Sequence, residues 1–257
     1  MKGSFIMAQA TLITSNEVTE TEVYRSETPP QTRTHVPLAH GRFVDQVKHA
    51  LDYRGWNVSD SQYGLFPGKL GDIKYEGANL FGVMKIQKQG LLSENSDYEI
   101  AIGLRNSHDK RFSAGIASGV VVIVCENLDF YGDFIAKHKH TANVEHELHV
   151  RIYGMVEKIE DQYTRHAKKI EQYRDRLLSD SETHDLIVQC ADRRVFPWSY
   201  GEKVLKEFRN PRHEEFEDRS VWAFNNATTE ILKNRNFQDL QPSTQRLHSL
   251  LGEVCLN

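Results

Sequence analysis

Cysteine is scarce in this sequence, and long apolar runs are missing. The cysteines are Cys125, Cys190 and Cys255, widely spaced and odd in number. This pattern encodes neither a disulfide framework nor a zinc site built from closely paired cysteines, and it favours a reducing compartment. No stretch of about 18 apolar residues occurs, so we expect no helix that spans a membrane. We also expect no secretory signal, because the first residues lack its continuous apolar core.

The motifs of several large enzyme classes are absent as well. The sequence contains no GxxxxGK[ST], GxGxxG, HExxH or GxSxG pattern, so nothing indicates a P-loop nucleotide hydrolase or one of the common hydrolase classes. Basic residues do not dominate either, because the net charge is -4. A nucleic-acid partner would therefore be held by a local basic patch. We favour a protein that is not an enzyme and that needs no cofactor.

The chain divides into three regions by composition. Residues 1–36 are rich in Thr, Ser and Glu and poor in residues to bury, which predicts a flexible N-terminal arm. Residues 37–142 begin with an amphipathic helix that ends near Gly55. From Val58 to Cys125, short β-branched and aromatic runs alternate with turn residues, which predicts an antiparallel meander of about four to six strands.

Residues 143–257 are predicted to be helical. Apolar residues from Leu148 to Leu177 follow a spacing of three and four, which predicts one long amphipathic helix of roughly 50 Å. Shorter helices are expected around 181–192, 201–209, 218–234 and 239–253, with breaks near Pro197, Pro211 and Pro242. The fold class is therefore α+β, and the long helix also suggests contacts with another subunit, as in a homo-oligomer.

The polar stretch "RNSHDKR", residues 105–111, joins two apolar runs. Asn, Ser and Asp favour turns, so an ordinary hairpin connection explains the stretch completely. Alternatively, Arg105, Lys110 and Arg111 contact phosphates while Asn106 and His108 add polar contacts. A third alternative is catalysis by His108 together with Asp109.

A second polar stretch, "FIAKHKHTANVEHELH", carries four histidines. A metal site is conceivable, with His108, Asp109, His138 and His140 as its candidate ligands, but the spacing matches no established ligand motif. We favour the absence of a metal and a solvated basic patch in which Lys137, Lys139 and His140 contact phosphates. Cys125 ends an apolar run, which is typical of a buried and inert thiol.

Several motifs occur in an order that resembles a known family. They are "VPLAHGRFVDQV", "ANLFGVMKI", "GLRNSHDKRFSAGIASGVVVIVCENLDF" and "KHKHT". The family is domain of unknown function 932, found in phages, prophages and conjugative plasmids, and the similarity covers residues 36–142 well and the remainder loosely. The resemblance implies that the protein is encoded by a mobile element and that it acts in the cytoplasm of a bacterial host. It supplies no catalytic residues, but it suggests a shared site between the hairpin and the start of the helical half.

The expected meander followed by a long helix also resembles, in architecture alone, the single-strand annealing proteins. We therefore expect a phage or plasmid protein that binds single-stranded nucleic acid in recombination or genome protection. One alternative is a counter-defence protein that binds a host immune protein or its nucleotide signal. Another is a metal-dependent enzyme that uses His108, Asp109, His138 and His140.

Overall fold

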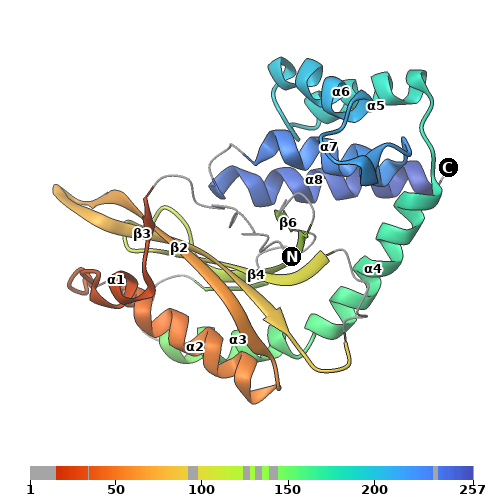
Figure 1. Ribbon diagram of the computed structural model, residues 1–257. Helices are drawn as coiled ribbons and strands as arrows, with labels where there is room; N and C mark the ends of the chain where they lie inside the picture. Colours follow the sequence, from red (N-terminus) through yellow and green to blue (C-terminus); the bar gives the residue numbers. More distant parts are fainter. Residues whose placement is uncertain are drawn as a thin grey trace, which may run out of the picture.

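An antiparallel sheet forms the centre of this computed structural model, which describes residues 16–33, 35–91, 98–123, 128–130, 135–138, 144–233 and 237–256 (Figure 1). The long strands are β2 (Asn57–Leu70), β3 (Ile73–Gln87), β4 (Tyr98–Ser107) and β5 (Ala114–Val122). Three short strands complete it: β1 (Glu17–Val18), β6 (Leu128–Phe130) and β7 (Ile135–His138). Neighbours follow the order β1-β2-β3-β4-β5-β6, and β7 also pairs with β5. The predicted antiparallel meander is confirmed.

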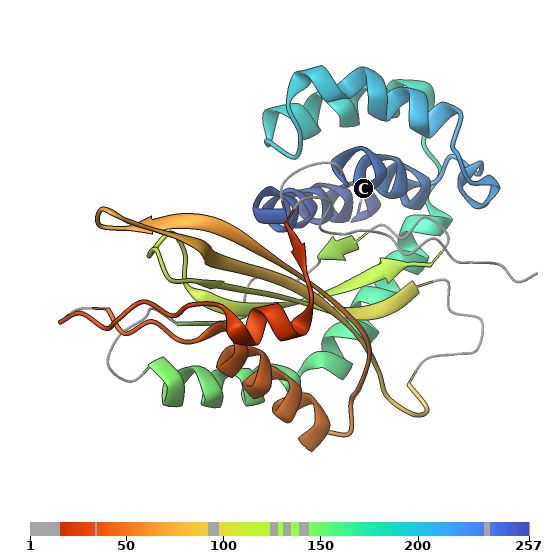
Figure 2. The ribbon, with the colours of Figure 1, turned by 60° about the vertical axis from the view of Figure 1, so that its left-hand side comes forward.

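Helices cover both sides of this sheet (Figures 1 and 2). On one side lie α2 (His40–Tyr53) and α3 (Val144–Val156), whose apolar residues join those of the sheet in the core. On the other side lie α7 (Val221–Leu232) and α8 (Phe237–Leu256). Residues of β5 are buried along the whole strand, which explains why its sequence is continuously apolar or small rather than alternating.

The expected long helix is two helices, and this part of the prediction is wrong. The helix α3 ends at Val156, and α4 (Ile159–Asp175) begins after a turn at Glu157 and Lys158. The packing partners change along the chain: α3 packs on α2 and the sheet, whereas α4 contacts the sheet only at its start, through Gln162 and Tyr163, and then α7 and α8. One apolar stripe with a helical period therefore serves two surfaces that lie in different directions.

The rest of the helical half matches the predicted segments within a few residues. It contains α5 (Asp180–Asp192), η1 (Trp198–Tyr200), α6 (Gly201–Arg209) and η2 (Glu214–Phe216) before α7. Helix α5 begins with a capping box in which Ser179 and Glu182 satisfy each other's backbone N–H groups. The predicted break at Pro242 is wrong, because this residue lies inside α8 near its N-terminal end. A proline there removes only one intrahelical hydrogen bond.

Part of the predicted flexible arm is ordered. Glu17 and Val18 pair with Gly64 and Tyr63, and α1 (Glu20–Arg25) follows with Val23 buried in the core. Val23 is the one buried side chain of this helix. A single buried residue is too weak a signal to be detected from amino-acid composition. Residues 1–15 of the expected arm lie outside the described residues, and the division of the rest at residue 143 stays a prediction.

None of the helices in the described ranges combines the length and the apolar character that crossing a membrane requires.

Gly82 in β3 provides a test of how tightly the sheet packs. A Cβ atom at this position would lie 2.7 Å from Leu104 Cδ1 and 2.8 Å from Tyr63 Cδ1. We expect Gly82→Ala to lower the free energy of unfolding by about 1–3 kcal/mol through overpacking. In contrast, a Cβ atom at Gly154 in α3 would have nothing within 4 Å. Gly154→Ala should therefore raise the free energy of unfolding by about 0.5–1 kcal/mol. Urea denaturation of both variants measures the difference, and equal stability of the two would contradict the packing described.

Candidate functional site

The stretch 105–111 contains the last three residues of β4 and the start of its connection to β5, and its polar residues divide into a buried and an exposed set. Asn106, Ser107 and His108 are completely buried, whereas Lys110 and Arg111 are exposed. The structure does not support the predicted contacts of Asn106 and His108 with nucleic acid, because neither side chain reaches the surface. Their role must be sought inside the protein.

Two histidine rings stack in this buried region. The rings of His40 and His108 are parallel within 2°, with centroids 3.9 Å apart. His40 Nε2 donates to the carbonyl of Gly77 at 2.9 Å, and the Asn106 amide donates to His40 Nδ1 at 2.8 Å. A ring that donates at one nitrogen and accepts at the other is the neutral tautomer. The stack therefore includes at least one uncharged imidazole.

The carbonyl of Leu38 joins these side chains to the start of α2. It accepts from Asn106 Nδ2 and from His108 Nε2, both at 2.8 Å. His35 Nε2 donates in return to the carbonyl of His108 at 3.0 Å. We call His35, His40, Asn106 and His108 the histidine cluster. It attaches residues 35–40 to the end of β4, which lies far from them in the sequence.

Asp109 organises the turn that follows. Ser107 Oγ donates to its Oδ1 at 2.6 Å, and Asn79 Nδ2 donates to its Oδ2 at 2.9 Å. Burial alone would raise the pKa of Asp109, but these hydrogen bonds, the backbone N–H of Arg111 and the charge of Arg111 lower it below its ordinary value. These contacts involve Ser107, Asn79 and Arg111 rather than the His108 ring. The arrangement favours a structural turn over a catalytic pair.

The same turn requires a glycine on the neighbouring strand. A Cβ atom at Gly68 of β2 would lie 2.1 Å from Asp109 Oδ2 and 2.8 Å from Asn79 Nδ2. The backbone of β2 therefore lies directly against the Asp109 carboxylate of this turn.

A basic and aromatic surface lies over this turn. The Arg105 guanidinium lies 5.3 Å from the centre of the half-buried Phe112 ring, and burial lowers the pKa of Arg105. The Phe112 ring contacts that of Phe81, with centroids 5.1 Å apart, and the Phe81 ring contacts that of Phe66, with centroids 5.5 Å apart. We define the basic end of the sheet as Arg105, Lys110 and Arg111 together with the exposed Lys69 and Lys74, which face each other on β2 and β3.

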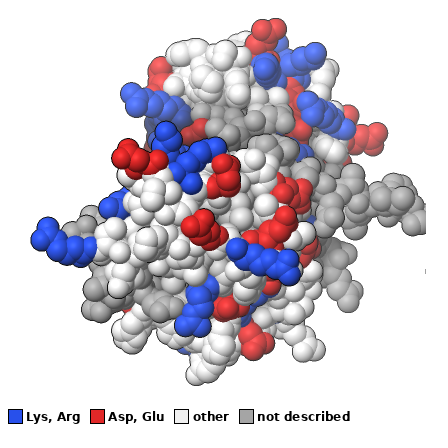
Figure 3. All heavy atoms as spheres, turned by 90° about the vertical axis from the view of Figure 1, so that its left-hand side faces the viewer, with Lys and Arg blue, Asp and Glu red and all other residues white. Residues whose placement is uncertain are grey.

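This surface is not part of a uniform positive field. The hairpin of β2 and β3 extends beyond the other strands (Figure 1), and the view from that side shows Lys and Arg interspersed with Asp and Glu (Figure 3). Any attraction of a polyanion is therefore local to the basic end of the sheet.

The second predicted region approaches the first along the backbone. His138 in β7 pairs with Ala114, the first residue of β5, so Lys137 and His138 belong to a strand that ends beside the connection 105–111. Their side chains lie outside the described set, as do Lys139, His140 and Cys125. His146 and His149 are on α3, where the His149 ring contacts that of Tyr153 at 4.5 Å.

Neither metal nor thiol chemistry gains support. Within the described ranges no three or more His, Cys, Asp or Glu residues are grouped so that they could hold a metal ion. His138 and His140, two of the four candidate ligands, fall outside that search as far as their side chains are concerned. Cys190 is buried in α5, and burial raises the pKa of its thiol to about 12, which makes it unreactive.

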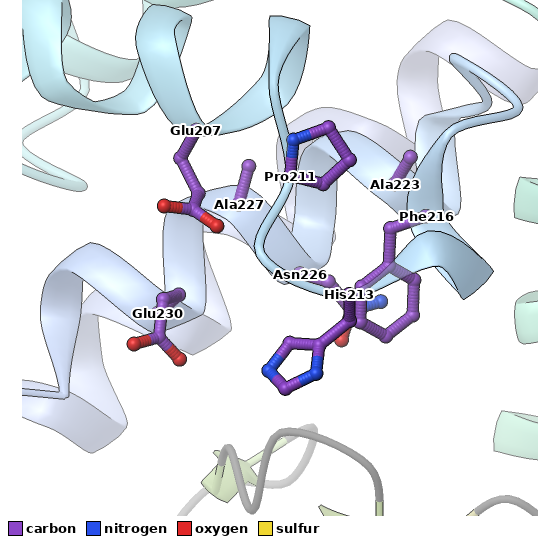
Figure 4. Close-up of a pocket in the computed structure, with 8 residues that line it drawn as sticks. All are labelled: Glu207, Pro211, His213, Phe216, Ala223, Asn226, Ala227 and Glu230. Carbon is purple, nitrogen blue, oxygen red and sulfur yellow. The ribbon is translucent and has the colours of Figure 1, made fainter.

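A small pocket in the helical half carries no sequence signal. Glu207, His213, Phe216 and Glu230 line it, from α6, η2 and α7 (Figure 4). Arg212 pairs with both carboxylates, at 3.2 Å to Glu207 and 2.8 Å to Glu230. The cavity of about 10 Å³ has room for roughly one water molecule, so we do not assign it a ligand.

The histidine cluster predicts a dependence of stability on pH. Burial lowers the pKa of His108 below its usual 6.5, with a further decrease from His35 and partial opposition from the Leu38 carbonyl. The unfolded chain then binds a proton at higher pH than the folded chain, so stability is complete above about pH 6.5 and falls as the pH decreases toward the folded pKa. From about pH 7.5 to about pH 5.5 the free energy of unfolding should therefore decrease, because the unfolded chain gains this proton before the folded chain does.

Urea denaturation at the two pH values measures this loss, and His108→Gln should reduce it. The exposed His184 serves as the matched control, since His184→Gln should leave the loss unchanged. An identical pH dependence in the wild type and the His108→Gln protein would contradict the assignment.

Comparison with known proteins places these features in a family. The family model described as "Domain of unknown function (DUF932)" matches residues 61–251. No curated protein and no solved structure matches the chain. The match extends through the helical half, well beyond the region of clearest resemblance in the sequence, and it includes β4, the turn at Asp109 and α4 to α7. The chain therefore belongs to the DUF932 family.

Proposed function

We propose that the protein binds single-stranded nucleic acid at the basic end of the sheet. The observation that carries this proposal is the Arg105 guanidinium held over the Phe112 ring, with Lys110 and Arg111 exposed beside it. Cationic groups next to half-buried rings are the combination that proteins use to bind phosphates and stack bases of a flexible strand.

Each side chain has a distinct part in this proposal. Lys110 and Arg111 contact phosphates, and Lys69 and Lys74 extend the basic surface along the hairpin. Phe112 and Phe66, both half-buried, offer their rings to bases. The histidine cluster contacts no ligand and instead holds the turn in place, so that the phosphate-binding groups are positioned in advance.

The charge distribution favours a single strand over a duplex. The net charge of -4 and the mixed signs around the hairpin leave only a local site of a few cations. A flexible strand can bend to follow such a site, whereas a rigid duplex would bring its phosphates against neighbouring carboxylates.

The biological setting follows from the resemblance that the sequence motifs carry. A protein of a phage or plasmid that acts in the bacterial cytoplasm meets single strands during recombination and during attack on its genome. We propose a role in one of these processes, with several copies of the chain assembled along one strand. Lys137, Lys139 and His140 add phosphate contacts in this proposal, because β7 ends beside the start of β5.

Removing two charges from the basic end tests the proposal. Lys110→Asn suits the positive φ of 66° at this position, and Arg111→Gln removes the second charge. Each lost phosphate contact should lower the slope of log affinity against log salt by about 0.7, so the double variant should lose about 1.4. Fluorescence anisotropy with a labelled oligo-dT at several salt concentrations measures both affinity and slope.

The matched control removes two charges elsewhere. Lys203→Asn with Lys206→Gln changes the exposed face of α6 by the same amount and should leave both affinity and slope unchanged. Wild-type protein that binds no oligo-dT at low salt, or equal effects of the two double variants, would overturn the proposal.

A further inference from the structure

One edge of the sheet is open along part of β2. The strand runs from Asn57 to Leu70, and β1 pairs with it only at Tyr63 and Gly64. After Thr19 the chain turns into α1, so among the described strands none pairs with the outer side of Asn57–Ser61. A strand edge of this kind is a template for an additional strand.

Two open grooves lie along this edge. One has a volume of about 380 Å³ and is lined by Glu17–Glu20, Glu22 and Ser61–Tyr63. The other has a volume of about 450 Å³ and is lined by Lys48, Asp52 and Trp56–Ser61. The two grooves share Ser61, so they adjoin at that residue of the strand.

The backbone of this edge already uses a substitute partner. The N–H of Ser61 donates to Asp60 Oδ1 at 2.8 Å instead of to a neighbouring strand. An incoming backbone carbonyl can replace that carboxylate, which would then be free to pair with a basic side chain of the incoming segment. The exchange conserves the number of hydrogen bonds at the edge.

The grooves are acidic. They contain the carboxylates of Glu17, Glu20, Glu22, Asp52 and Asp60 and one lysine, Lys48. Lys48 is held by Glu20 at 2.6 Å, and Glu22 caps α1 through Thr19. Glu17, Asp52 and Asp60 remain to attract a cation from outside. A second copy of the same edge would bring like charges together, which disfavours pairing between two copies.

We propose that Asn57–Ser61 binds an extended, basic segment of a partner protein as an additional strand of the sheet. Backbone hydrogen bonds give this segment its affinity, and alternate Lys or Arg side chains face Glu17, Asp52 and Asp60. The apolar stems of those side chains lie along the groove. This partner site is on β2, apart from the turn at Asp109 that carries the proposed nucleic-acid site, and it does not depend on that function.

Peptides with different backbones separate strand pairing from simple charge attraction. The probes are fluorescein-labelled peptides of equal length that alternate Lys with Val, Lys with Pro, and Glu with Val. The Lys-Pro peptide keeps the charge but lacks half of the backbone N–H groups. We expect the Lys-Val peptide to bind and each of the other two to bind at least about tenfold more weakly, as measured by fluorescence anisotropy.

A pair of charge reversals locates the site. Asp60→Lys should weaken binding of the Lys-Val peptide by about tenfold. In contrast, Asp72→Lys at the tip of the β2–β3 hairpin should leave the affinity for this peptide unchanged. A thermal melt of each variant confirms that it is folded, and Glu17→Lys provides a second reversal in the other groove if Asp60→Lys does not fold. Equal binding of the Lys-Val and Lys-Pro peptides, or equal effects of the reversals at 60 and 72, would overturn the proposal.

Discussion

The carbonyl of Leu38 is the acceptor on which the arrangement of this end of the molecule depends. It receives hydrogen bonds from Asn106 and His108 at the end of β4. In the other direction, His35 donates to the carbonyl of His108 and His40 to that of Gly77. A buried polar group without a partner costs roughly as much as several packed methyl groups contribute. The segment before α2 and the connection after β4 are therefore fixed to each other, and everything exposed on that connection inherits its position from a buried cluster.

The elements were predictable because each has a local signal, but their partners were not. The strands β2 to β5 and the helices α5 to α8 follow from residue type and period, and α6 has the expected bounds, Gly201–Arg209. The long helix failed because a periodic stripe does not say which surface it meets, and α3 and α4 meet different ones. The order beyond residue 16 was not predictable, because α1 has one buried side chain, Val23, and its polar contacts, Glu20 with Lys48 and Tyr24 with Asp45, leave no pattern in the composition.

The site shows the same limit at the level of side chains. The motif at 105–111 was recognisable as a polar connection, and Lys110 and Arg111 are exposed as a basic tip requires. What the sequence could not reveal is that Asn106 and His108 face inward, because their partners, Leu38 and His40, are remote in the chain. The likeness to the DUF932 family was visible in the same residues. A motif that identifies a family thus includes buried residues that join two parts of the structure here.

The contact between Gly68 and Asp109 has a consequence for how this protein can change through evolution. The absence of a side chain at 68 leaves the space that the Asp109 carboxylate occupies, so the two positions share one volume. A mutation that adds a side chain on β2 must be accompanied by loss or displacement of the carboxylate on the turn, and the turn in turn sets where Lys110 and Arg111 project. Sequence drift on a surface strand is thereby coupled to the geometry of a loop on another hairpin, and variation at either position is constrained by the other.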